Sequence, residues 1–92
     1  MDVSPSKWRR VRVADNLFNI ELGKRIRQYR KAKNVTQEKL ALLAGIDRAY
    51  IGLVERGEQN IGFCNLCQIC VALECDVATL TVGIPRLPGM VG

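Results

Sequence analysis

The 92-residue sequence contains no histidine, only three prolines and few aromatic residues, which make up 5% of the chain. The lack of histidine removes the commonest general base and a common metal ligand. The sequence also has no glycine-rich phosphate loop and no cysteine–histidine pair, so we find no group of side chains suited to catalysis. These absences predict a protein that is not an enzyme and that uses no cofactor or metal.

Long apolar runs are also absent. No stretch approaches the roughly 18–20 uninterrupted apolar residues of a membrane span. The opening residues, MDVSPSKWRRVRVADN, lack the apolar segment of a secretory signal. We therefore expect a cytoplasmic protein with no membrane partner. Apolar residues still form 48% of the chain, which is enough for the core of one small domain.

Positive charge is concentrated in the first third of the chain. Residues 1–35 hold ten Lys or Arg and three acids, a formal charge of +7, whereas residues 36–92 hold four and six, a formal charge of −2. This asymmetry favours a polyanionic partner, and nucleic acid before a membrane. A solvated basic helix with a floppy tail explains the charge alone equally well.

The spacing of apolar residues divides the chain into three parts. Residues 1–15 are interpreted as a basic N-terminal arm, because KWRRVRV alternates basic and apolar residues without helical spacing. Residues 16–82 form the folded domain, and residues 83–92, with two prolines, form an irregular C-terminal tail. Within the domain we predict helices at about 16–33, 37–44, 48–56 and 63–73, and a short fifth helix containing Val77 and Leu80.

Capping residues separate the second and third predicted helices. Thr36 and Asp47 are good N-caps, and Gly45 fits the position past a helix end, where a positive φ costs glycine little. The connection of about three residues is typical of a helix-turn-helix. With no strand signal, the fold class is all-α.

The segment TQEKLALLAGIDRAYIGLVERGEQN, residues 36–60, resembles the DNA-binding domain of the lambda-repressor-like, xenobiotic-response-element-type helix-turn-helix regulators. The resemblance covers about residues 17–82 and implies a compact five-helix fold and a DNA-binding transcription regulator. The stretch DRAYIGLVERGEQN is most similar to the controller proteins of restriction–modification systems, whose recognition helix commonly reads Asp-Arg-Thr-Tyr-Ile. Ala49 stands where those proteins have threonine. The residues that carry the match are Thr36, Gln37, Leu40, Ala41, Ala44, Gly45, Ile46, Ile51, Glu55 and Gly57.

The start of the third helix is the candidate for reading bases, because the N-terminal residues of a recognition helix reach the base edges. Arg48 can bind guanine O6 and N7 in bidentate fashion, with a contact to phosphate alone as the alternative. Ala49 offers a methyl contact to thymine, and Leu53 is expected to be exposed. Gly52 either lets the DNA approach closely or is a small residue on the exposed face. The predicted base-reading residues are Arg48, Ala49, Gly52 and Leu53.

Phosphate contacts are expected around these residues. Gln37 opens the second helix, where free N–H groups favour a phosphate, and the resemblance implies that it also braces the recognition helix. Asn60 has two possible roles, satisfying the following turn or contacting phosphate. The predicted phosphate contacts are Thr36, Gln37, Tyr50, Asn60 and Arg27, with Arg9, Arg10 and Arg12 of the arm as further candidates.

The resemblance also implies roles inside the domain. Glu55 is expected to pair with Arg30 and to fix the angle between helices. The four cysteines, Cys64, Cys67, Cys70 and Cys75, superficially suggest a zinc or iron–sulfur site. The family has small or apolar residues at three of these positions, so we interpret Cys67, Cys70 and Cys75 as core residues and Cys64 as exposed.

The expected mode of action is a homodimer on double-stranded DNA. One recognition helix reads too few bases, so a palindromic operator with half-sites about 34 Å apart is predicted. Val77, Leu80 and Val82 lack an obvious intramolecular partner and are the predicted dimer contact. RNA polymerase is a further candidate partner, because activation or repression depends on where the operator lies. The alternative function is an antitoxin-like regulator whose main partner is another protein.

Overall fold

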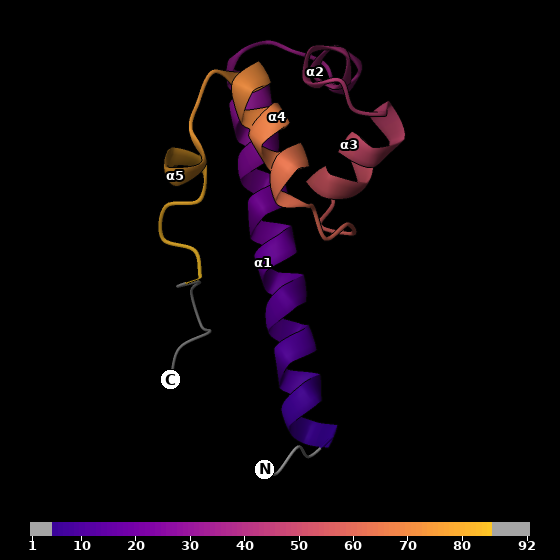
Figure 1. The fold of residues 1–92 in the computed structure, drawn as a ribbon, viewed down its shortest axis with the longest axis vertical. Coiled ribbons are helices and arrows are strands. Elements are labelled where there is room, and N and C mark those ends of the chain that lie inside the picture. Colours follow the sequence, from indigo (N-terminus) through magenta and orange to yellow (C-terminus); the bar gives the residue numbers. More distant parts are fainter. Residues whose placement is uncertain (1–4, 86–92) are drawn as a thin grey trace.

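The computed structural model describes residues 5–85, and side chains from residue 16 onward. Five helices and no strand are found in this range, which confirms the all-α prediction. No helix in the described residues is long and apolar enough to span a bilayer. In chain order the helices are α1 (Pro5–Ala32), α2 (Gln37–Ala44), α3 (Arg48–Glu55), α4 (Phe63–Leu73) and α5 (Val77–Leu80) (Figure 1).

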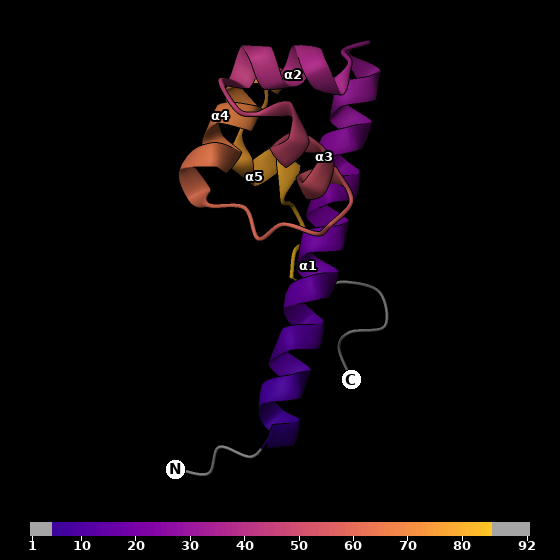
Figure 2. The same ribbon diagram turned by 90° about the vertical axis from the view of Figure 1, so that its right-hand side faces the viewer.

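Helix α1 is much longer than the sequence pattern suggested. It begins at Pro5, whereas we predicted a helix from about residue 16 preceded by an arm, and that boundary is corrected here. A proline suits the first helical turn because its missing N–H has no intrahelical partner there. Figures 1 and 2 show α1 running past the other helices as a rod, and the molecule measures 46 × 23 × 19 Å. The side chains of Arg9, Arg10 and Arg12, and the tail from residue 86, lie outside the described residues.

Side-chain caps define the starts of α2, α3 and α5, and those of Thr36 and Asp47 confirm the prediction. The Thr36 hydroxyl accepts a hydrogen bond from the Lys39 amide at 3.0 Å, and the Asp47 carboxylate accepts one from Ala49 at 3.2 Å. Asp76 caps α5 in the same way through Thr79. Gly45 follows α2 with φ +69°, in the left-handed region that glycine tolerates. These caps orient α2 and α3 in the helix-turn-helix.

A single core joins all five helices. Most of its residues come from α2, α3 and α4; α2 packs against α3 and α4, and α1 packs mainly against α3. The buried apolar residues are Ile26, Leu40, Ala41, Ala44, Ile51, Val54, Leu66, Ile69, Cys70, Leu73 and Leu80. Leu80 has no exposed surface, so the expectation that it lacks an intramolecular partner and faces a second copy was wrong. Its side chain instead anchors the single turn of α5.

Two glycines allow α1 to cross the end of α3 closely. A Cβ added to Gly23 would lie 2.3 Å from the carbonyl oxygen of Val54 and 2.8 Å from that of Glu55. Gly57, with φ +75°, lies so close to Ile20 that a Cβ there would be 2.7 Å from the Ile20 Cα. The backbone of α1 therefore sets the position of α3 directly.

Candidate nucleic-acid interface

Helix α3 is divided into an exposed beginning and a buried end. Arg48 and Ala49 are exposed, whereas Val54 and Glu55 are buried. Ala49 receives no packing from the core, and Tyr50 lies half-buried against it. An α-helix that is held at its C-terminal end and free at its N-terminal turn has the form that major-groove reading requires.

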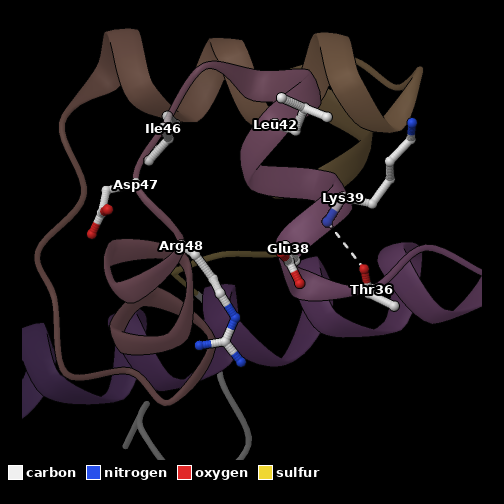
Figure 3. Close-up of a pocket in the computed structure, with 7 residues that line it drawn as sticks. All are labelled: Thr36, Glu38, Lys39, Leu42, Ile46, Asp47 and Arg48. Carbon is white, nitrogen blue, oxygen red and sulfur yellow. Dashed lines mark hydrogen bonds between the residues drawn. The ribbon is translucent and has the colours of Figure 1, made fainter.

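An open groove separates the start of α2 from the start of α3. Figure 3 shows the Arg48 side chain extending beyond the first turn of α3, on the side toward which Glu38 also points. The guanidinium is thus free to meet a base edge or a phosphate. The groove is lined by Thr36, Glu38, Lys39, Leu42, Ile46, Asp47 and Arg48.

Two of the predicted base-reading residues are less accessible than expected. Leu53 is half-buried, although we expected it to be exposed. Gly52 is buried, because the Arg56 guanidinium and the Gln37 amide lie over it. A Cβ at residue 52 would be 3.3 Å from Arg56 Nη1. The glycine therefore makes room for these two polar side chains, and of the two interpretations of Gly52 the one that placed a small residue on the exposed face is wrong.

The predicted phosphate contacts differ in exposure. Thr36, Asn60 and Arg27 are exposed, as a contact to DNA requires. Gln37 is half-buried, and its Nε2 donates a hydrogen bond to Glu55 Oε1 at 3.0 Å. This bond gives the bracing of α3 that the resemblance implied. Arg56, for which the sequence pattern predicts no role, lies beside Gln37 over Gly52.

The ion pair between α1 and α3 is present and buried. Arg30 Nε lies 2.6 Å from Glu55 Oε2, and Nη2 donates to Oε1 at 3.1 Å, while Nη1 donates to the Val35 carbonyl. The Arg30 side chain is 10% exposed and that of Glu55 1%. Bidentate geometry makes such pairs strong and directional. Together with Gln37, Glu55 connects the start of α2, the end of α3 and α1.

The burial of the cysteines agrees with the prediction for Cys64 and Cys70, and only in part for Cys67 and Cys75. Cys70 is buried, Cys67 and Cys75 are half-buried, and Cys64 is exposed. In residues 16–85 no group of three or more Cys, Asp or Glu is arranged to hold a metal ion. Burial, with further contributions from Cys75, Cys67 and Asp76, raises the pKa of the Cys70 thiol to about 12. Cys70 is thus a protonated core residue.

The raised pKa of Cys70 predicts that the folded domain loses stability in alkaline solution. The folded state keeps the Cys70 proton to a higher pH than the unfolded chain, whose thiol pKa is 9.0. The stability that the protonated Cys70 thiol contributes is therefore fully present below pH 9 and is lost as the pH rises toward 12. In urea denaturation between pH 8 and 11, stability should fall more steeply in the native chain than in Cys70→Ala, by up to about 1.4 kcal/mol per pH unit. Equal pH dependence of stability in the native chain and in Cys70→Ala would contradict a raised pKa at Cys70.

Comparison with known proteins gives concordant matches. A model of the helix-turn-helix family matches residues 26–80. The control protein C.SmaI of Serratia marcescens is 41% identical over 59 residues, covering 64% of this chain and 70% of its own. The control protein C.BamHI of Bacillus amyloliquefaciens is 39% identical over 59 residues, covering 63% and 73%. The crystal structure of the restriction-modification controller protein C.AhdI of Aeromonas hydrophila is 40% identical, with a TM-score of 0.66 over 67% of this chain and 94% of that one.

Proposed function

Because this chain belongs to the helix-turn-helix family of DNA-binding transcription regulators and has controller proteins as its relatives, we propose that it binds a palindromic operator as a homodimer. The observation that carries the proposal is the exposed first turn of α3, with Arg48 and Ala49 free, on a helix whose other end is fixed by the Arg30–Glu55 pair. Such a helix can enter the major groove without rearranging the core.

Arg48 is the principal base reader in this proposal. Its guanidinium fork matches O6 and N7 of a guanine, and a good bidentate contact contributes about 1–3 kcal/mol of discrimination. Ala49 adds a methyl contact in the same turn. Thr36, Gln37, Asn60 and Arg27 fix the register of the helix by contacting phosphates on either side, which confers affinity without sequence preference.

The second copy meets the first through the C-terminal part of the domain. Val82 is 69% exposed and Val77 is half-buried, so both are accessible to a partner, whereas Leu80 is buried in the core. A dimer held there presents two copies of α3 to half-sites about 34 Å apart. The basic residues 7–12 add contacts to the DNA backbone. The position of the operator relative to a promoter then decides whether the dimer assists RNA polymerase or excludes it.

The test is selection of bound sequences from random duplex DNA. The native chain should enrich a palindrome, and Arg48→Ala should lose preference at one symmetric guanine, with about 10–100-fold weaker binding to the native operator. Arg27→Ala is the matched control, since it removes the same charge from a predicted phosphate contact. It should weaken binding to all DNA sequences alike, and it should lower the slope of log binding constant against log salt concentration by about 1. Salt-sensitive binding without any enriched motif would refute sequence-specific regulation.

A further inference from the structure

Arg25 of α1 holds the C-terminal segment of the domain by an unusual set of bonds. Its Nη1 donates to the backbone carbonyl of Leu80 at 3.1 Å and to that of Val82. Its Nε donates to Glu21 Oε2, one turn earlier in α1, at 3.0 Å. The two side chains are 20% and 28% exposed, so this contact is partly shielded from water. We call the Glu21–Arg25 pair, with its two carbonyl acceptors, the clamp.

The clamp acts on a segment with little support of its own. Helix α5 is four residues long, far shorter than an isolated helix needs for stability. The last carbonyls of a helix lack intrahelical partners, and Arg25 supplies a donor to two carbonyls at and beyond this end. Leu80 anchors the segment on the core side. Arg25 fixes the backbone of the residues that follow, including the exposed Val82.

The same stretch of α1 also positions the recognition helix. Gly23, two residues before Arg25, lies against the last carbonyls of α3. Helix α1 contacts both α3 and α5, and Figure 1 shows these two helices on opposite sides of it. One turn of α1 therefore connects the DNA-reading element to the segment that carries Val77 and Val82.

We propose that the clamp is a positioning device for dimerisation, which orients the surface of Val77 and Val82 relative to α3 and so sets both the dimer affinity and the preferred spacing of half-sites. This inference rests on the proposed homodimer. Arg25 does not touch the second copy in this mechanism but acts through the backbone of residues 80–82. Arg25 lies 55 and 57 positions from the residues whose carbonyls it binds, and no local pattern in the sequence marks these two bonds.

Sedimentation equilibrium of the full chain, with and without an operator duplex, tests the proposal. Arg25→Ala should weaken dimerisation about tenfold, because a charged donor to two carbonyls is removed. Arg25→Lys keeps the charge beside Glu21 but lacks the several N–H donors of the guanidinium, so its loss of dimer affinity should be intermediate. Glu21→Gln retains an acceptor for Nε and should change the affinity about twofold or less. The matched control is Lys31→Ala, which removes an exposed cation from the same helix and should leave the dimer unchanged.

A double-mutant cycle separates positioning from general stability. If Arg25 acts through the turn that bears Val82, then Arg25→Ala and Val82→Ala should weaken dimerisation less than additively when combined. Operators with half-sites moved by one base pair give a second readout. The affinity of the Arg25→Ala protein should fall less on these operators than the affinity of the native chain does. Additive effects together with unchanged spacing preference would overturn the clamp as a positioning device. A tight native dimer that Arg25→Ala leaves intact would overturn the clamp alone, whereas a native chain that stays monomeric on DNA would overturn the homodimer as well.

Discussion

Replacing Gly23 with alanine should destabilise the domain by roughly 3 kcal/mol, at the upper end of the usual cost of overpacking. The added Cβ would lie 2.3 Å from the Val54 carbonyl oxygen and 2.8 Å from that of Glu55. Both obstacles are backbone atoms of α3, so rotation of a side chain cannot relieve the contact. The structure must move α1 away from α3, and this separates the recognition helix from its support.

Thermal denaturation followed by circular dichroism measures this effect. For a domain of this size, about 3 kcal/mol corresponds to a fall of roughly 15 °C in the midpoint. Gly62→Ala is the matched control, because a Cβ there meets no atom within 4 Å and φ is −73°. It should change the midpoint by a few degrees at most. A Gly23→Ala protein with a native midpoint and native operator affinity would show that α1 does not support α3 in this way.

Removal of Glu55 should have a similarly large effect on stability and should also abolish operator binding. Glu55→Ala leaves the buried Arg30 guanidinium with only the Val35 carbonyl, and breaking one side of a buried pair costs about 3–5 kcal/mol. The same change removes the acceptor of Gln37 Nε2, so the start of α2 is released from the end of α3. Urea denaturation and gel-shift titration measure the two losses.

A double substitution distinguishes folding from DNA binding in this network. Replacing both charges with apolar residues, Arg30→Met with Glu55→Met, should recover much of the stability, as apolar replacements of buried pairs often do. Operator affinity should remain low, because Gln37 still lacks its acceptor. Glu58→Ala, which breaks the exposed pair with Arg56, is the control and should change stability little. If Glu55→Ala costs no more than Glu58→Ala, the buried pair contributes no more than a surface pair.

Local sequence signals predicted the helix-turn-helix well. Thr36, Gly45 and Asp47 act within a few residues of themselves, through caps and a positive φ, so their roles can be recognised without the fold. The Arg30–Glu55 pair is different. It joins residues 25 positions apart, and only the resemblance to a known family indicated it.

The errors of the sequence analysis come from contacts that no local pattern reveals. The burial of Leu80 depends on how α5 folds back onto the core, so the apolar pattern alone does not distinguish it from a contact to a second copy. Gly52 was interpreted from helix propensity, whereas its surroundings depend on Arg56 and on Gln37 of another helix. The start of α1 was misplaced because alternation over residues 7–13 obscured a helix that begins at Pro5. The roles of Gly23 and Arg25 depend on the carbonyls of Val54, Glu55, Leu80 and Val82, which are distant in the sequence, so no local pattern predicts them.

The division of α3 into a free first turn and a fixed second one has a consequence for how new operators arise. Arg48 and Ala49 are exposed, so a substitution at either leaves the core intact. Only three residues later the helix is packed from Ile51 onward, and Glu55 is shared by three elements. Under the proposed base reading, substitutions at these two positions can therefore change the target sequence at almost no cost in folding. A lineage of such regulators can change its target DNA while its scaffold stays the same.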